Sequence, residues 1–383
     1  MILIEHGPRG APALFADARD VIVARRAREV MPALRRAEAA RRAGGWIAGY
    51  ISYEAGLALE PKLAPLMPRR RTAPLLVLGV FDGPQDAAPL LARAGAEAGA
   101  ARLSEPRPQV SRAAYDAAFA RVAGYIAAGD CYQINLTFPM SARLLSGTPL
   151  GLYGALRARQ AVGYGALADF GTGPVVISRS PELFFRVQEG VISARPMKGT
   201  APRDPDPARD AALAAELQAS DKARAENLMI VDLLRNDIAR ISAVGSVRVP
   251  ELYKVEPFAT VHQMSSTVTG RLTEGATLPA LVAALFPCGS VTGAPKIRAM
   301  QIIREVEPHP RGVYCGGIGW MSPEGDGAWN VAIRTLSLFP DGRVTLNVGG
   351  GVVQDSTAAG EWEEALWKAR YAMGLSGIPK ASG

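Results

Sequence analysis

The sequence predicts an α+β protein, because strands follow strands and helices follow helices along much of the chain. Residues 131–138 alternate apolar and polar side chains cleanly, which is typical of a strand. Other segments also have the composition of strands: 175–186, 191–198, 261–270, 314–320, 329–338 and 343–348. A further set has apolar side chains at helical spacing: 111–129, 207–218, 222–241, 278–285, 296–305 and 360–373.

Residues 1–105 are predicted to form an N-terminal subdomain whose strands complete the sheets of the rest of the chain. Its expected boundary is Pro106-Arg107-Pro108, and residues 106–383 form the second region. Within the subdomain, residues 18–39 are rich in Arg, Ala and Glu and predict a helix. Residues 44–54 and 75–81 predict strands.

The composition is that of an ordinary globular protein, with 48% hydrophobic and 21% charged residues among 383. The net charge of +7 comes mostly from arginines scattered among alanines. A nucleic-acid-binding surface would concentrate Lys and Arg, so we expect no nucleic-acid partner. A small acidic substrate fits better, and a merely solvated basic surface is the alternative.

The chain shows no sign of membrane insertion or secretion. No apolar run is long enough to cross a bilayer, and residues 1–5 lack a signal-peptide pattern. Cys131, Cys288 and Cys315 are widely spaced and form no metal-binding motif, which fits a reducing compartment. We therefore expect a cytoplasmic protein with no membrane partner.

Gln133, Asn135 and Thr137 share one face of the strand predicted for residues 131–138, while apolar side chains fill the other face. The simplest interpretation is that the polar face is exposed to solvent. The alternative is that it forms the floor of an active site.

Lys198 lies between Pro196, which fixes the backbone, and Gly199, which permits a sharp turn. Glu182 precedes it by sixteen positions, a separation that suits a hairpin. An amine beside a carboxylate on a neighbouring strand is a plausible catalytic pair. A lone loop lysine, however, is more often simply solvated.

Three further features have both a structural and a functional interpretation. Glu226 lies on the apolar face of the helix predicted for residues 222–241, where a carboxylate is usually a rim residue or an ion-pair partner. His262 lies near the start of the strand 261–270. The glycine-rich turn 286–296 lacks the phosphate-loop pattern, but its backbone N–H groups could bind a carboxylate.

Glu361, Glu364 and Lys368 fall on one face of the last predicted helix. Two carboxylates at this spacing can share a hard cation, which prefers oxygen ligands. A surface Glu–Lys ladder, worth about a few tenths of a kcal/mol per pair, is the more frequent explanation on spacing alone. Gly349-Gly350-Gly351, which precedes the helix, allows close approach to the backbone.

Taken in order, these segments resemble the chorismate-utilising enzymes, which include anthranilate synthase component I, aminodeoxychorismate synthase component I, and the isochorismate and salicylate synthases. The resemblance covers about residues 111–375, and the segment 49–54 also resembles shorter members. It implies two large, mostly antiparallel β-sheets packed in a sandwich with helices outside, and makes 106–383 the chorismate-binding catalytic region. It rests on these segments: the Gln133 strand, Ser180-Pro181-Glu182, Pro196 to Thr200, 222–237, His262, 289–296, Ile333-Arg334-Thr335 and 361–364.

The resemblance implies roles for the matching residues. Glu182 would be the general acid that protonates the departing C4 hydroxyl of chorismate. Glu226 and Glu364 would bind Mg²⁺, with Glu361 bound directly or through water, so that the metal is favoured over the ladder. The residues expected to line or contact the substrate are Gln133, Thr200, His262, Tyr314, Arg334, Gly349, Gly350 and Lys368.

Two positions separate the subfamilies. Enzymes that add water at C2 carry a lysine where this chain has Gln133, and anthranilate synthases usually carry an alanine where it has Lys198. A lysine at that position marks aminodeoxychorismate synthase component I, which aminates chorismate at C4 through a covalent intermediate. Anthranilate synthase component I is the alternative activity, and a non-catalytic binding protein is the alternative class.

The resemblance also implies a partner. No Gly-x-Cys-x-Gly motif surrounds the three cysteines, so a separate glutamine amidotransferase subunit is expected to supply ammonia. We expect no fused lyase domain. Because residues 1–105 do not match the long N-terminal region of regulated anthranilate synthases, we also expect no feedback inhibition by tryptophan.

Overall fold

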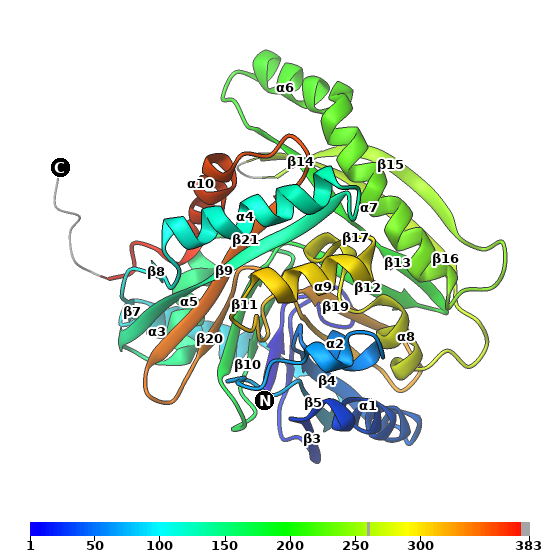
Figure 1. Cartoon of the computed structure of the whole chain (residues 1–383). Coiled ribbons are helices and arrows are strands. Elements are labelled where there is room, and N and C mark those ends of the chain that lie inside the picture. The colour runs from blue at the N-terminus through cyan, green and yellow to red at the C-terminus, as the bar shows by residue number, and fades with distance from the viewer. Residues whose placement is uncertain (259–260, 377–383) are drawn as a thin grey trace.

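Two β-sheets form the centre of the computed structural model, which describes residues 1–258 and 261–376 (Figure 1). The 11-stranded sheet has the order β17-β9-β21-β20-β11-β10-β1-β2-β6, with β7 and β8 paired to β9. The 10-stranded sheet has the order β14-β16-β13-β12-β19-β18-β4-β5-β3, with β15 paired to β16. Neighbouring strands run antiparallel, for example β21 with β9 and β14 with β16.

The strands of the 11-stranded sheet are β1 (Ile2–Ile4), β2 (Ala13–Phe15), β6 (Gln85–Asp86), β7 (Arg102–Leu103), β8 (Arg107–Pro108), β9 (Gln133–Ser146), β10 (Tyr164–Ala168), β11 (Val175–Ser180), β17 (Gly293–Ala294), β20 (Thr335–Leu338) and β21 (Arg343–Val352). Those of the 10-stranded sheet are β3 (Asp20–Ala24), β4 (Trp46–Ile51), β5 (Leu76–Phe81), β12 (Leu183–Gln188), β13 (Val191–Ala194), β14 (Met197–Pro202), β15 (Arg248–Pro257), β16 (Val261–Arg271), β18 (Gly317–Met321) and β19 (Gly327–Val331). The helices are α1 (Ala27–Arg42), α2 (Ala55–Leu59), α3 (Ala88–Ala98), α4 (Arg112–Ala127), α5 (Pro149–Arg159), α6 (Pro207–Ala219), α7 (Asp221–Ala239), α8 (Leu278–Leu285), α9 (Lys296–Val306) and α10 (Ala358–Lys368).

A hydrophobic core joins the two sheets. It contains buried side chains from β1, β2, β10 and β11 of the 11-stranded sheet and from β4, β5, β18 and β19 of the 10-stranded sheet. The rings of Phe15 and Phe81, one from each sheet, lie 5.5 Å apart. Alternate side chains of both sheets thus meet in one apolar layer, which confirms the predicted sandwich.

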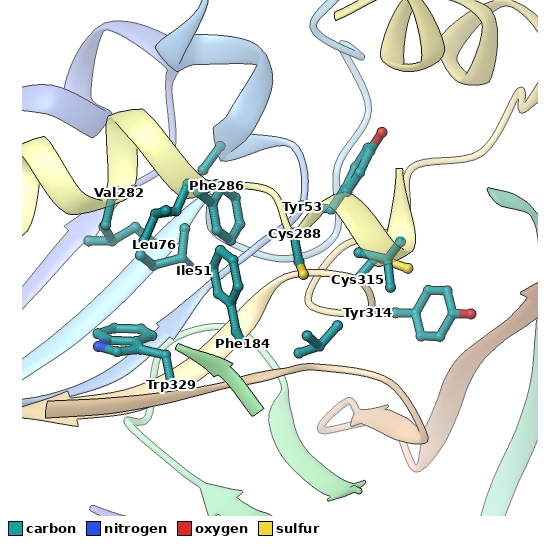
Figure 2. Packing of buried hydrophobic residues seen from close by; sticks show 14 of the residues in the cluster. Ile51, Tyr53, Leu76, Phe184, Val282, Phe286, Cys288, Tyr314, Cys315 and Trp329 are labelled. Carbon is teal, nitrogen blue, oxygen red and sulfur yellow. The ribbon is translucent and has the colours of Figure 1, made fainter. Parts of the chain in front are cut away.

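The helices lie outside this sandwich (Figure 1). Figure 2 shows α8 against the 10-stranded sheet, with Val282 and Phe286 beside Ile51 and Phe184. The rings of Phe184 and Phe286 are 6.2 Å apart. Among the described residues, no helix combines the length and the apolar character that crossing a membrane requires.

Most predicted segments match the observed elements. Helices α4, α6, α7, α8 and α9 and strands β4, β5 and β16 occupy the predicted residues within a few positions. Ser111 caps α4, because its hydroxyl accepts a hydrogen bond from the backbone N–H of Ala114. Residues 1–105 contribute strands to both sheets.

The helix predicted for residues 18–39 is wrong at its start. Residues 20–24 form β3, because Val21, Ile22 and Val23 are β-branched and pair with β5. The helix α1 begins only at Ala27.

Two segments predicted as single strands are each split between the sheets. Residues 175–186 form β11 in the 11-stranded sheet and β12 in the 10-stranded sheet, and the chain crosses between them at Pro181-Glu182. Residues 329–338 likewise include the end of β19 and all of β20, with Arg334 at the crossing. Proline cannot donate to a strand ladder, which explains the first break.

The two crossings lie side by side. The backbone N–H of Arg179 donates to the carbonyl of Arg334 over 2.9 Å, and the N–H of Val331 donates to the carbonyl of Glu182 over 3.1 Å. Ser180 adds a side-chain hydrogen bond to the carbonyl of Val331 at 2.6 Å. These bonds fix the backbone positions of Glu182 and Arg334 relative to each other.

Candidate active site

Lys198, Gln133 and Gly351 meet where β14, β9 and β21 come together. A Cβ atom on Gly351 would lie 3.1 Å from Lys198 Nζ and 3.0 Å from the amide carbon of Gln133. Gln133 is fully buried, and among the described residues neither polar atom of its side chain has a hydrogen-bond partner. Buried amides are nearly always hydrogen-bonded, so both polar atoms of this side chain are available to a bound molecule.

The other polar side chains of β9 are buried too. Asn135 and Thr137, on the same face as Gln133, are 7% and 5% exposed. The simplest interpretation of this face, exposure to solvent, is therefore wrong. The face lies inside the protein because Lys198 approaches Gln133 on this side of the sheet and Asn135 Nδ2 lies 3.9 Å from Cys315 Sγ, whereas α4 packs against Phe138 on the opposite face.

The backbone of β14 directs Lys198 toward this place. Gly199 adopts φ +86°, and the register with β16 shifts between Met197 and Thr200, which is a local bulge. A Cβ atom on Gly199 would lie 2.9 Å from the Cβ of Ala223 on α7, so only glycine fits between strand and helix.

The Lys198 amine is enclosed, although part of its side chain remains accessible. Burial lowers the pKa of Lys198, because the charged ammonium loses its hydration. Glu226 on α7 acts in the opposite direction, and the charge of Lys368 lowers the pKa further. The net lowering of the pKa makes the free amine, the nucleophilic form of lysine, more accessible than in a solvated lysine.

Glu182 is buried at the crossing between β11 and β12, and its Oε1 accepts a hydrogen bond of 2.8 Å from Ser290 Oγ. Burial raises the pKa of Glu182, whereas the Ser290 hydrogen bond and the charges of Lys198 and Lys368 oppose this rise. A carboxyl group with a raised pKa can act as a general acid.

The predicted hairpin between Glu182 and Lys198 is wrong. The strand order places β13 and β16 between β12 and β14, so the two residues do not lie on neighbouring strands. The chain after the β12–β13 hairpin passes across β16 to the edge of the sheet. The two groups nevertheless affect each other's pKa: the charge of Lys198 lowers the pKa of Glu182, and the charge of Glu182 raises the pKa of Lys198.

Glu361, Glu364 and Lys368 on α10 face Gly350 on β21. A Cβ atom on Gly350 would lie 2.6 Å from Glu361 Oε2, 3.5 Å from Lys368 Nζ and 3.7 Å from Glu364 Oε1. The Lys368 amine donates to the carbonyl of Gly349 at 3.0 Å and pairs with Glu364 at 2.7 Å. The Glu–Lys pair expected for a surface ladder is thus present, but its lysine turns inward to the sheet.

Glu361 has one satisfied and one unsatisfied oxygen. Its Oε1 accepts a hydrogen bond of 2.7 Å from Ser356, while its Oε2 is buried without a partner among the described residues. Burial raises the pKa of Glu361, and the charge of Glu364 adds to the rise. An orphaned carboxylate oxygen near a second carboxylate fits a hard cation with oxygen ligands.

Glu226 does not join these two carboxylates. Within residues 1–258 and 261–376, no three His, Cys, Asp or Glu side chains gather at a spacing suited to a metal ion. Glu226 on α7 acts instead on Lys198. The structure therefore brings together two of the three predicted Mg²⁺ ligands, Glu361 and Glu364.

Arg334 is half-buried, adopts φ +49°, and forms no ion pair within the described chain. Burial lowers the pKa of Arg334, and the neighbouring Tyr371 opposes this shift. Tyr314 is buried, and Figure 2 shows its ring beside Cys315. Burial raises the pKa of Tyr314, so its phenol stays neutral. Neither residue has a hydrogen bond to Lys198 in the described part of the chain.

Thr200 and His262 have partners outside this group. The Thr200 hydroxyl donates to Gln263 Oε1 at 3.1 Å, and His262 Nε2 lies 2.8 Å from Asp210 Oδ1. The hydrogen bond from Arg203 holds the pKa of Asp210 well below its usual range, so the carboxylate stays ionised. His262 Nδ1 is buried without a partner among the described residues.

Residues 8–374 match the family described as "chorismate binding enzyme". The chain belongs to this family. The match covers the strands and helices that carry the Lys198 group and the α10 carboxylates, so it confirms the resemblance seen in the sequence.

Two curated relatives of this chorismate-binding enzyme have different names. Aminodeoxychorismate synthase component 1 from Klebsiella aerogenes is 44% identical over 262 residues, which are 68% of this chain and 57% of the relative. Anthranilate synthase component 1 from Streptomyces coelicolor is 42% identical over 302 residues, 79% of this chain and 57% of the relative. The chain thus spans little more than half the length of these relatives.

The fold of the chorismate-binding enzyme also matches solved structures. The crystal structure of anthranilate synthase component I from Streptococcus pneumoniae gives a TM-score of 0.72 at 29% identity. The match covers 85% of this chain and 80% of the other.

Sequence patterns did not reveal two residues that support the site in this chorismate-binding enzyme. The sequence allowed the turn 286–296 to bind a carboxylate through backbone N–H groups, and it gave no sign that the Ser290 hydroxyl would hydrogen-bond to Glu182. Arg311 is buried and donates to the carbonyls of Val291 at 2.8 Å and Asn135 at 2.6 Å. No local spacing signals the second contact, because 176 positions separate its partners.

Proposed function

We propose that this chorismate-binding enzyme aminates chorismate at C4 with ammonia to give 4-amino-4-deoxychorismate, a step toward 4-aminobenzoate and folate. The observation that carries the proposal is the enclosed Lys198 amine beside the unpartnered Gln133 amide. Relatives with either synthase name are similarly close, so identity does not choose between them. Lysine rather than alanine at position 198 favours the C4 reaction.

In the proposed reaction, Lys198 Nζ attacks C2, the two conjugated ring double bonds shift to C1=C6 and C4=C5, and the C4–O bond breaks. Glu182 supplies a proton, so the hydroxyl leaves as water. Ammonia then attacks C4, both double bonds return to their original positions, and the C2–Nζ bond breaks to restore the lysine. A proton from the new C4 ammonium returns to the Glu182 carboxylate. Covalent catalysis of this kind divides one difficult substitution into two easier ones.

The proposed cofactor is Mg²⁺, held by Glu361 and Glu364; the family resemblance adds Glu226, which would have to approach these two carboxylates to bind the same ion. Bound there, the ion would neutralise and orient a carboxylate of the substrate. Arg334 would bind a substrate carboxylate through its guanidinium, which has no ion pair in the described chain. The remaining proposed contacts are Thr200, His262, Tyr314, Lys368 and the backbone at Gly349 and Gly350.

We further propose that a glutamine amidotransferase subunit supplies the ammonia, in the cytoplasm. The words "component 1" in the names of the relatives support a second component. Free ammonium salt should replace that subunit in vitro.

The test is to incubate the chain with chorismate, Mg²⁺ and an ammonium salt, and to identify the products by mass. We expect aminodeoxychorismate, which needs a lyase to become 4-aminobenzoate. Fluorescent anthranilate in its place would support the second candidate, anthranilate synthase, which the Streptomyces coelicolor relative favours. If no chorismate were consumed, the alternative of a non-catalytic binding protein would remain.

A further inference from the structure

A cavity of about 1080 Å³ lies on the 11-stranded sheet, apart from the Lys198 group. Its wall includes residues of β8, β9, β20 and β21 together with the loops 71–73 and 309–312. Within the described chain, none of the predicted site residues lines it. We call it the arginine cavity, after the guanidinium groups in its lining: Arg71, Arg107, Arg143, Arg311 and Arg343.

The charge of this lining is unbalanced. Among the described residues it contains a single carboxylate, Glu105, which accepts a hydrogen bond from the backbone N–H of Gly374. Arg311 and Arg343 have acidic partners, Glu307 and Asp341. The other arginines of the lining must find their counter-charge elsewhere.

Arg71, Arg107 and Arg143 form no ion pair within residues 1–258 and 261–376. Arg143 donates to the backbone carbonyl of Asp341 at 2.8 Å, and Arg71 donates to those of Pro68 and Arg25. The Arg71 Nε is buried without a partner among these residues. Carbonyl groups satisfy some N–H donors but leave the positive charges uncompensated.

Some arginines elsewhere in the fold are compensated by a neighbouring carboxylate. Arg179, which is 1% exposed, pairs with Glu5, and Arg203 pairs with Asp210. Three unpaired guanidinium groups around one hollow repel each other and create a positive potential there, which a concave wall focuses. An anion in the hollow would remove this repulsion.

The floor of the arginine cavity offers neutral hydrogen-bonding groups. Ser141, Thr345 and Ser337 are aligned across β9, β21 and β20, because Thr345 is in register with both serines. Asn347 lies two residues along β21 from Thr345 and so shares its face. Hydroxyl and amide groups on one face can donate to the oxygens of an anion bound between the arginines.

We propose that the arginine cavity binds a small polyanion that carries carboxylate or phosphate groups. Guanidinium groups bind both kinds of oxyanion through paired hydrogen bonds. The volume of about 1080 Å³ slightly exceeds the usual range for small-molecule sites, about 300–1000 Å³, so it leaves room for such a ligand. The site does not depend on the proposed chorismate chemistry, since none of its lining residues is proposed to contact the substrate or the metal; Arg311 lines the cavity and also supports the candidate active site from behind.

The experiment is calorimetric titration of the full chain with citrate and, separately, pyrophosphate at low ionic strength. We expect one site per chain for at least one probe, weakened at higher salt because the charges are partly exposed. Binding of citrate alone assigns a carboxylate ligand, and binding of pyrophosphate alone assigns a phosphate ligand. The double variant Arg107→Gln/Arg143→Gln should weaken binding at least tenfold.

Two variants serve as controls. Arg35→Gln removes an exposed charge on α1, far from the cavity in sequence, and Lys198→Met alters the candidate active site. Both should bind the probes as the parent does, and circular dichroism should show all variants folded. Absence of binding by both probes, equal weakening in Arg35→Gln, or loss of binding in Lys198→Met would each overturn the proposal.

Discussion

The Arg311 guanidinium and the Glu307 carboxylate form a buried ion pair, 2.7 Å between Nη2 and Oε1, that holds two walls of the candidate active site. Arg311 donates to backbone carbonyls in β9 and in the turn that carries Ser290. Glu307 accepts the backbone N–H of Thr137 at 2.7 Å. The pair therefore ties the strand of Gln133 to the residue that binds Glu182.

Arg311→Met should destabilise the protein strongly, because it leaves the Glu307 carboxylate buried without its partner. Breaking a buried pair in this way costs about 3–5 kcal/mol. Urea unfolding gives the free-energy change. As a control, Arg121→Met removes an exposed pair with Glu305 and should cost about 1 kcal/mol or less. Equal stability of the two variants would contradict the assigned role of Arg311.

Ser290→Ala tests a positioning residue. The hydroxyl opposes the raised pKa of Glu182, so its removal should raise that pKa further. A general acid is active only while protonated, so the reaction rate falls as the pH rises through the pKa of this acid, which gives the alkaline limb of the pH–rate profile. In the variant this limb should move to higher pH, with the fold intact. Ser246→Ala, at an exposed turn, is the control. An alkaline limb at the same pH in Ser290→Ala and in the parent would refute the influence of Ser290 on the pKa of Glu182.

Lys198 should form a covalent adduct with the substrate when ammonia is withheld. Its folded pKa is lowered, so the free amine should appear, and the rate should rise, at a pH below the usual lysine value of about 10.4. Intact-protein mass spectrometry should show the adduct on the Lys198 peptide. Lys198→Met should lose it, whereas Lys222→Met, at an exposed helical site, should keep it. If Lys198→Met aminated chorismate at the rate of the parent, Lys198 would be excluded as the nucleophile.

The same substitution has a stability effect of predictable sign. Between the folded and the unfolded pKa of Lys198, the unfolded chain binds more protons, so stability rises with pH in this window. Below it, the folded protein carries the cost of an enclosed ammonium. Lys198→Met should therefore raise the melting temperature most at low pH, and its advantage should shrink as the pH rises. Thermal unfolding at several pH values measures this difference.

Glu361→Gln, Glu364→Gln and Glu226→Gln should each raise the Mg²⁺ concentration needed for turnover, by about tenfold or more, because an amide cannot replace an anionic ligand. Glu363→Gln alters an exposed residue of the same helix and should not. Mg²⁺ titrations of activity separate the cases. Parent-like titrations for all three variants would remove the metal assignment.

Arg334→Lys should raise the KM for chorismate by roughly tenfold, which is about 1.4 kcal/mol. A lysine keeps the charge but not the planar pair of donors that binds a carboxylate. The melting temperature should change little, because the guanidinium has no ion pair in the described chain to lose. Arg370→Lys, an exposed neighbour of the last helix, is the matched control. Identical KM values in both variants would contradict the role.

Local periodicity explains which elements could be predicted. The helices from α6 to α9 and the strand β16 follow from their own side-chain spacing, which each segment carries by itself. The split of residues 175–186 could not be found in this way, because the apolar residues of β11 and β12 suit either sheet. Only Pro181 marked the break.

The meeting of the site residues could not be predicted from local periodicity. The family resemblance supplied the identity of Lys198, Gln133 and Glu361, but their meeting depends on pairing between strands far apart in the chain. The hairpin expected for Glu182 and Lys198 failed for this reason. Support by Ser290 and Arg311 was likewise invisible, since long-range hydrogen bonds leave no local pattern.

The two side-by-side crossings between the sheets make the site inseparable from the completed architecture. Glu182 and Arg334 lie at these crossings, and their backbones are joined by the hydrogen bonds that link the segments. Contacts over about 150 positions form only after long loops have closed, which is entropically unfavourable early in folding. A partly folded chain, or a fragment ending between residues 182 and 334, therefore holds neither group in place. The enzyme cannot acquire its chemistry before its two sheets have assembled.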